Sequence, residues 1–311
     1  MDLASKNIRL RHLRCFLAVA EAGSVTRAAA ALNTSQPAVS RTLAELEQLI
    51  GRALFTRSAA GLTLSAEGEQ FRRPVAAALA QIEAGARAAQ GRAQAPRVVV
   101  APLPNVMRGL VPAAAARFKA EAPLVPLRIR WAHVPALLQE LQEGQVDMIV
   151  GRLLAMDRMS GLSFEQLFTE ELVFAASPAH PLAGAAELTL EQVDAGLVVV
   201  PNEGSIIRTE MDRYLAARGF VGFARPVESI SFDFTRAFLR QIPAVACVPL
   251  SAVRRELAVG ALVRLPLGGD ELMGPVGITT VSGRRLPEPA QRFAEKLREV
   301  VAEGLHISDL I

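Results

Sequence analysis

The sequence has few of the residues that build cross-linked, metal-binding or catalytic sites. Among its 311 residues are two cysteines, Cys15 and Cys247. Two cysteines cannot make the disulfide framework of a secreted domain, so we expect small core residues in a reducing cytoplasm. The four histidines show no metal-ligand spacing: His12, His133, His180 and His306. Neither a Gly-x-Ser-x-Gly motif nor a P-loop is present, so we expect no catalytic residues, metal or cofactor.

Long apolar runs are also missing. No window of about 18 residues is free enough of charge and proline to cross a bilayer. The N-terminal charges are not followed by the apolar stretch of a signal peptide. We therefore expect no membrane partner and a cytoplasmic location.

The basic charge that is present lies at one end. The formal net charge is +3, from 34 basic and 31 acidic residues. Residues 1–95 hold twelve Lys or Arg against seven Asp or Glu, whereas the remainder holds 22 against 24. Such a chain has room for two or three compact units. The basic N-terminal unit is the one expected to face the phosphates of a nucleic acid.

Residues 35–51 have the pattern of a DNA-recognition helix. Thr34 or Ser35 can cap its first turn, and Gly51 can end it. Apolar residues at helical spacing would bury one face: Val39, Leu43, Leu46 and Ile50. Short or forked polar side chains at the exposed start suit base edges and phosphates. An ordinary amphipathic helix with a polar start is the alternative.

The flanking sequence favours a winged helix-turn-helix over residues 1–64. A first helix ends at Gly23, Ser24 caps a second, and residues 33–35 form the turn before the third. Two β-capable segments, 54–56 and 62–64, follow as a wing. We expect DNA contacts from Ser35, Gln36, Pro37, Ala38, Ser40, Arg41 and, at the base of the wing, Arg57.

This segment resembles the DNA-binding domain of the LysR-type transcriptional regulators. The matching stretches are residues 13–16, 23–29, 35–41, 43–46, 54–57 and 64–68. The resemblance implies a regulator that binds a double-stranded DNA operator with dyad symmetry as a homodimer or homotetramer. An activator would also contact RNA polymerase.

Residues 65–92 are predicted to form a linker helix and the start of a hinge that runs to Pro96. Ser65 can cap the helix, while Pro74 should bend it or remove a hydrogen bond. Its apolar stripe consists of Phe71, Val75, Leu79, Ile82 and Ala86. A helix of about 25 residues is too long for a small winged domain to cover. The stripe therefore needs a partner, either the C-terminal domain or, as the resemblance favours, the same helix of a second subunit.

From Arg97 the pattern alternates apolar strands with helices, which is typical of a sheet covered on both faces. The predicted strands are 98–101, 127–130, 148–151, 172–175, 197–200, 245–249 and 276–281, and the predicted helices 109–120, 135–143, 205–218, 232–240 and 287–303. We expect an α+β multidomain protein whose residues 93–311 form a two-lobed domain like the periplasmic binding proteins. Lobe I would comprise residues 97–164 and 268–311, and lobe II residues 165–267, with crossings near 151–167 and 265–276.

Ligands of such domains bind at strand ends and helix N-termini between the lobes. The segment 201–208 offers backbone N–H groups, a capping hydroxyl and the guanidinium of Arg208, which together suit a carboxylate. A surface ion pair is the alternative role for Arg208. The expected effector contacts are Leu103, Pro104, Asn105, His133, Asn202, Gly204, Ser205, Arg208, Ser231 and Phe232.

The C-terminal half also resembles one branch of the family, the regulators of protocatechuate catabolism and the related galactose-binding-protein regulators. The matching stretches are residues 151–153, 161–167, 180–182, 204–208 and 273–277. The protocatechuate branch implies activation of an aromatic-acid operon by a carboxylated muconate or its lactone, an anion. The galactose branch implies control of sugar-uptake genes. Departures at 175–178 and 246–248 leave the effector open. An α/β enzyme fused to a DNA-binding domain and an architectural DNA binder are the competing classes.

Overall fold

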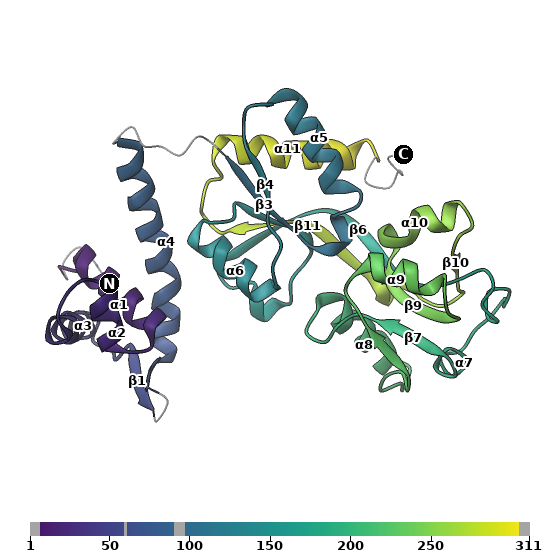
Figure 1. Ribbon diagram of the computed structural model, residues 1–311, viewed down its shortest axis with the longest axis horizontal. Helices are drawn as coiled ribbons and strands as arrows, with labels where there is room; N and C mark the ends of the chain where they lie inside the picture. Colours follow the sequence, from purple (N-terminus) through teal and green to yellow (C-terminus); the bar gives the residue numbers. More distant parts are fainter. Residues whose placement is uncertain (1–6, 59–60, 90–96, 305–311) are drawn as a thin grey trace. The chain divides into compact units, whose positions relative to one another are not determined.

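The computed structural model describes residues 7–58, 61–89 and 97–304. The chain divides into two compact units, residues 1–95 grouped with 138–145, and residues 96–137 grouped with 146–311 (Figure 1). Each unit is described by itself. No helix in the described ranges is long and apolar enough to cross a membrane.

The first unit is a winged helix-turn-helix followed by a long helix. Its elements are α1 (Leu10–Ala22), α2 (Val25–Ala31), α3 (Gln36–Ile50), β1 (Phe55–Ser58), β2 (Gly61–Leu64) and α4 (Ala66–Ala89). Phe16 of α1 lies at its centre and contacts the rings of Phe55 and Phe71, at centroid distances of 5.4 and 5.2 Å. Aromatic contacts at these distances add to the area that the rings bury. The wing and α4 are thereby packed on the same core as the three short helices.

Most of the predicted helix ends are confirmed. The Ser24 hydroxyl accepts a hydrogen bond from the Arg27 N–H, and the Ser65 hydroxyl accepts one from the Gly68 N–H. Gly51 ends α3 at φ 78°, a left-handed conformation that glycine adopts without steric cost. The prediction for the start of α3 is wrong in one detail. Ser35 holds the capping position, but its side chain makes no capping hydrogen bond.

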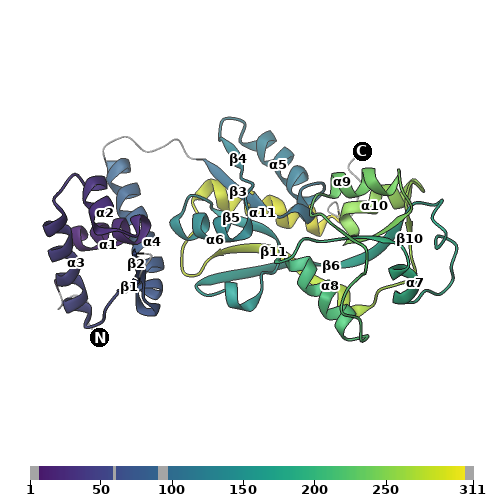
Figure 2. The same cartoon turned by 60° about the horizontal axis from the view of Figure 1, so that its bottom comes forward.

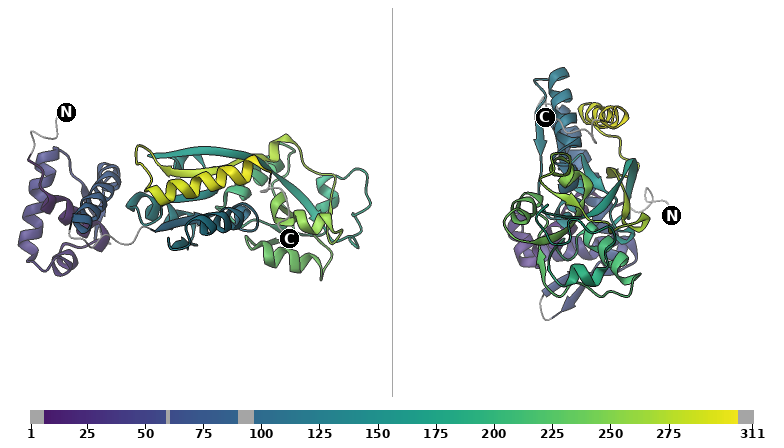
Figure 3. Two further views of the ribbon diagram at one scale, coloured as in Figure 1. Left: turned by 90° about the horizontal axis from the view of Figure 1, so that it is seen from above. Right: turned by 90° about the vertical axis from the view of Figure 1, so that its right-hand side faces the viewer.

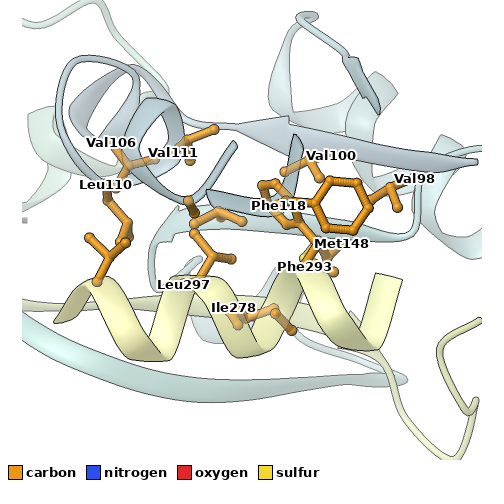
Figure 4. Close-up of a cluster of buried hydrophobic side chains, with 14 of the residues drawn as sticks. Val98, Val100, Val106, Leu110, Val111, Phe118, Met148, Ile278, Phe293 and Leu297 are labelled. Atoms are coloured by element: carbon orange, nitrogen blue, oxygen red, sulfur yellow. The ribbon is translucent and has the colours of Figure 1, made fainter. Parts of the chain in front are cut away.

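The second unit contains one nine-stranded sheet, in the order β4-β3-β5-β11-β6-β9-β7-β8 with β10 paired to β6. Lobe I holds β3 (Val98–Pro102), β4 (Leu127–Ile129), β5 (Met148–Arg152) and β11 (Met273–Val281), with η2 (Pro104–Val106), α5 (Leu110–Glu121), η3 (Met156–Arg158) and α11 (Glu288–Ala302). Helix α6 (Val134–Glu143) lies between β4 and β5 in the chain, and its residues from 138 onward are grouped with the first unit. Helices α5 and α11 lie side by side over this part of the sheet (Figure 3). Phe118 and Phe293 meet edge to face between them, 5.6 Å apart (Figure 4).

Lobe II holds the other half of the sheet. Its elements are α7 (Leu190–Asp194), β7 (Leu197–Val200), α8 (Ile206–Ala216), β8 (Pro226–Glu228), α9 (Phe232–Leu239), β9 (Ala244–Pro249), α10 (Leu250–Ala258), β10 (Val263–Arg264) and η4 (Asp270–Leu272). Helix α8 packs on one face with Leu172 and Phe174, and α9 and α10 pack on the other with Val173 and Ala175. Alternate residues of one strand therefore serve two cores.

The two lobes share a strand, which the sequence analysis missed. Strand β6 (Leu162–Ala176) is 15 residues long. Residues 162–171 pair with β11, and residues 172–176 pair with β9 (Figure 2). The last six residues of the predicted crossing at 151–167 already lie in β6 and pair with β11 of lobe I, so the crossing does not take place there. The four acidic or amide residues of β6 gave the appearance of a loop: Glu165, Gln166, Glu170 and Glu171. Helix α10, which directly follows β9, was also missed.

Candidate DNA-binding and effector sites

The start of α3 presents an exposed polar surface. Gln36 and Arg41 are exposed, Ser40 is half-buried, and the Gln36 amide donates to the Ser40 hydroxyl at 3.3 Å. The predicted contacts Ser35, Pro37 and Ala38 are exposed as well. On the opposite side Val39, Leu43 and Leu46 are buried in the core. The helix can therefore offer its polar start to a groove of DNA without disturbing its packing.

The recognition helix is held by the elements before it. The N–H of Thr34 donates to the carbonyl of Ala29, which fixes the turn, and Asn33 adopts a left-handed φ of 50°. The thiol of Cys15 on α1 donates to the carbonyl of Val39 on α3 at 3.5 Å. Burial raises the pKa of the Cys15 thiol, so this residue is a packing residue at neutral pH.

The wing is tied to the recognition helix through Glu47, which the sequence analysis did not single out. One carboxylate oxygen of Glu47, near the end of α3, accepts hydrogen bonds from the N–H groups of Leu54 and Phe55 at 2.7 and 3.3 Å. The wing itself pairs Phe55 with Leu64 and Arg57 with Leu62. The backbone of Arg57 lies in β1, and its side chain lies outside the described residues. Its contact with DNA stays a prediction.

In lobe I, the predicted effector residues follow the carboxyl end of β3. Leu103 is buried and Pro104 half-buried, and the single turn η2 carries Asn105 inward, where it is 7% exposed. The Asn105 amide donates to a Glu170 carboxylate oxygen at 2.9 Å. His133 is exposed in the segment between β4 and α6, with its ring 6.3 Å from that of Trp131. Asn105 is thus already engaged inside the protein.

In lobe II, the segment 201–208 predicted to hold a carboxylate, called the cradle below, forms the loop before α8 and the first turn of that helix. The Ser205 hydroxyl accepts from the Arg208 N–H at 3.3 Å and donates to the carbonyl of Asn202 at 2.7 Å. Gly204 adopts a φ of 73° in the turn before it. The guanidinium of Arg208 pairs with Asp212 at 2.9 Å and with Glu228 at 3.1 Å. Arg208 therefore makes surface ion pairs, which is the alternative role predicted for it from the sequence.

The cradle lies beside the start of α9. The N–H of Ser229 donates to the carbonyl of Val200 at 2.9 Å, so the chain after β8 runs next to the chain after β7. Ser231 is exposed and caps α9 by accepting from the Phe234 N–H. Phe232 is half-buried and packs with both apolar clusters of lobe II. The fold thus brings the lobe II candidates to one sheet edge, as predicted for the ends of parallel strands.

A set of charged residues between the lobes was not predicted from the sequence. Arg152 pairs with Glu210 and donates to the carbonyl of Glu170, while Arg108 pairs with Glu256 at 2.9 Å. Only Arg152 had a signal, as part of a stretch shared with the family. Their partners lie far away in sequence, so no local pattern marks them.

Nearby Cys247 is fully buried, and burial raises the pKa of its thiol to about 12. In the part of the chain that the structure describes, no three His, Cys, Asp or Glu side chains gather as a metal site would require.

Comparison with known proteins agrees with this geometry. Residues 10–69 match the model of the bacterial regulatory helix-turn-helix proteins of the LysR family, and residues 91–302 match the LysR substrate binding domain. The transcriptional regulator PcaQ of Agrobacterium fabrum is 33% identical over 97% of both chains. The regulator GalR of Pseudomonas putida is 31% identical over 94% of this chain and 74% of its own. The solved full-length LysG of Corynebacterium glutamicum, with its effector Arg bound, has a TM-score of 0.68 over 95% of this chain and 99% of that one; at 19% identity this shows the fold.

Proposed function

The chain belongs to the LysR family of bacterial transcriptional regulators, and on that premise we propose what it binds and how it responds. It is a DNA-binding regulator with an effector-binding domain, and its relatives are regulators rather than enzymes. We propose that its DNA is an operator with dyad symmetry and that its effector is an anionic small molecule. Since it acts on a bacterial operator, we place it in the cytoplasm.

The observation that carries the DNA proposal is the exposed polar start of α3. Gln and Arg can each make paired hydrogen bonds to a base edge in the major groove. We assign that role to Gln36 and Arg41, and phosphate or minor-groove contact to Arg57. The buried opposite face of α3 and the tie through Glu47 support this, because they fix the helix and the wing relative to each other.

The effector proposal places an anion between the lobes. We assign contacts to Ser205 and Arg208 on α8, Ser231 on the neighbouring loop, and Asn105 from lobe I. A carboxylate of the effector would take the place of Asp212 or Glu228 on Arg208. We propose, from the resemblance to the protocatechuate branch, that the protein activates an aromatic-acid operon and contacts RNA polymerase at its promoter. Likeness to the regulator PcaQ over nearly the whole chain supports the choice of this branch.

A neutral sugar is the second candidate effector. Arg208 already has two carboxylate partners, so this cradle need not hold an unpaired cation when it binds an uncharged ligand. Likeness to GalR over 94% of this chain supports the same alternative.

We propose a dimer through α4 and a tetramer through the effector domains. Val75 and Leu79 are buried in their own unit, so Leu79 would report on folding rather than on assembly. Ile82 is 48% exposed further along α4, and it is the residue of the stripe that we assign to a second subunit. Ile82→Asp should give monomers by sedimentation and lose binding to a dyad operator, with Gln70→Asp, at an exposed position of the same helix, as the matched control.

A thermal-shift screen tests the effector proposal. Full-length protein is heated with carboxylated muconates, their lactones, protocatechuate, galactose and galactonate. A ligand that binds only the folded state raises the melting temperature. We expect the largest rise with a carboxylated muconate or lactone, reduced in Arg208→Ala. The largest rise with galactose would instead select the sugar branch, and no rise with any compound would contradict both assignments.

A further inference from the structure

The guanidinium of Arg152 lies between the two lobes. Arg152 is the last residue of β5, opposite Val276 of β11, and its side chain is 1% exposed. One terminal nitrogen pairs with the Glu210 carboxylate on α8 of lobe II, and the other donates to the carbonyl of Glu170 on β6 at 2.7 Å. One buried cation therefore joins lobe I, lobe II and the strand they share.

The surroundings leave space for this ion pair. Gly274 has no side chain, and a Cβ there would lie 2.5 Å from Nη1 of Arg152 and 2.8 Å from Oε1 of Glu210. Burial lowers the pKa of the Arg152 guanidinium, and the negative charge of Glu170 opposes that effect. Taking two charges out of water is unfavourable unless each keeps its partner. Removing either Arg152 or Glu210 alone would leave the other without its ion-pair partner.

A second polar contact joins the lobes at α10. The Glu170 carboxylate accepts hydrogen bonds from the Asn105 amide at 2.9 Å and from the Ser251 N–H at 3.2 Å. The Ser251 hydroxyl donates to the carbonyl of Asn105 at 2.9 Å. Arg108 makes two hydrogen bonds to Glu256, at 2.9 and 3.0 Å. Because α8 and α10 cover opposite faces of lobe II, the lobes are tied on both sides of β6.

Helix α8 carries both Glu210 and the proposed effector cradle. Ser205 caps its first turn, and Glu210 follows five residues later on the same 11-residue helix. Arg208 is two residues from Glu210, about 200° around the helix axis, and it pairs instead with Glu228 at the end of β8. A shift of the cradle therefore shifts Glu210, because a short α-helix moves as one body.

We infer that Arg152 is a positioning residue, which with Glu210 ties α8 to the strands between the lobes and sets the angle between lobe I and lobe II. Through this Arg152–Glu210 ion pair, which we call the interlobe joint, a displacement of the cradle by an effector moves lobe I relative to lobe II. The inference rests on the proposed function for its biological meaning, but the interlobe joint itself can be measured without any effector.

The test is an electron-spin distance measurement on the full chain. Nitroxide labels are placed at Ala120→Cys on α5 and Ala237→Cys on α9, both exposed positions on different lobes. Cys15 and Cys247 are buried, and labelled protein is diluted with unlabelled protein to suppress distances between subunits. We expect a narrow distance distribution for the parent protein and a shifted, broadened one for Glu210→Gln. Arg152→Lys should lie between them, because it keeps the charge but cannot make both hydrogen bonds.

The control is Glu165→Gln, which breaks an exposed ion pair with Arg298 inside lobe I and should leave the distribution unchanged. If Glu210→Gln fails to fold, the double variant R152M/E210L removes both charges, a change that folded proteins often tolerate. A folded Glu210→Gln or R152M/E210L variant with the distance distribution of the parent protein would overturn the inference that this ion pair sets the angle between the lobes. The distance measurement uses protein without an effector. Its failure would therefore not contradict the proposed effector, which the thermal-shift screen tests separately.

Discussion

The candidate residues of the two units differ in what they already contact. At the start of α3, Gln36 and Arg41 are exposed on a surface whose buried side is fully packed. In the effector unit, Asn105 and Arg208 are held by Glu170, Asp212 and Glu228. If the proposed assignments are right, DNA meets side chains that are already exposed, whereas an anionic effector exchanges with carboxylates that already contact Asn105 and Arg208. We therefore expect mutations of the internally paired residues to lower stability, and mutations of the exposed residues of α3 to weaken DNA binding.

The largest expected effect is on the stability of the effector unit. Arg152→Met removes a buried guanidinium and leaves the half-buried Glu210 carboxylate without its ion-pair partner, which should lower the free energy of unfolding by about 3–5 kcal/mol. Urea unfolding followed by intrinsic fluorescence reports this unit, since the one Trp and the one Tyr of the chain are Trp131 and Tyr214. Adding Glu210→Leu should recover most of the loss. If Arg152→Met alone were as stable as the parent protein, the internal contacts of the effector unit would not stabilise it more than exposed residues do.

The tie between α3 and the wing should come next. Glu47→Ala leaves the N–H groups of Leu54 and Phe55 without their carboxylate acceptor, and hydrogen bonds to a charged group contribute about 1.5–3 kcal/mol. The first unit has neither Trp nor Tyr, so far-UV circular dichroism is the measurement. Glu21→Ala, at an exposed position of α1, is the matched control. Equal stability of the two variants would show that the wing is held by its apolar contacts alone.

Arg41→Ala should affect DNA binding without affecting stability. Loss of a paired contact to a base should weaken operator binding by about 1–3 kcal/mol for each base read. Stability should change by less than about 0.5 kcal/mol, as for other exposed side chains. Fluorescence anisotropy and a thermal melt on the same preparation separate the two effects. A fall in stability as large as the fall in affinity would make Arg41 a structural residue like Arg152.

The smallest effect is expected from an exposed ion pair of the effector unit. The hydrogen bond from Arg298 lowers the pKa of the Glu165 carboxylate below its ordinary 4.5. The stabilisation is therefore present above the ordinary pKa and is lost as the pH falls through the lowered one. Glu165→Gln should reduce stability at pH 7 by about 0–1 kcal/mol, and the difference from the parent should vanish once the pH has fallen below the lowered pKa of Glu165. A difference that persists at low pH would have another cause.

Features that depend on local sequence could be predicted, whereas features that depend on contacts between distant residues could not. The bounds of α3 and the exposure of its polar start follow from local helical spacing, so both were predicted within a residue. Strand β6 was missed because its pairing with β11 and β9 is non-local and its middle is acidic. The roles of Glu170 and Ser251 depend on that pairing, as do those of Arg152 and Glu210. The effector contacts can be listed from strand ends, but their partners follow only from the fold.

Selection of DNA from a random library by the full-length protein tests the central claim most directly. If the start of α3 reads base edges in a symmetric assembly, selection should yield an inverted repeat whose half-sites lie about one helical turn apart or more. The same selection with Arg41→Ala should lose preference at the same position of each half-site. Enrichment of a site without dyad symmetry, or an Arg41→Ala protein that selects the parent sequence unchanged, would contradict the account.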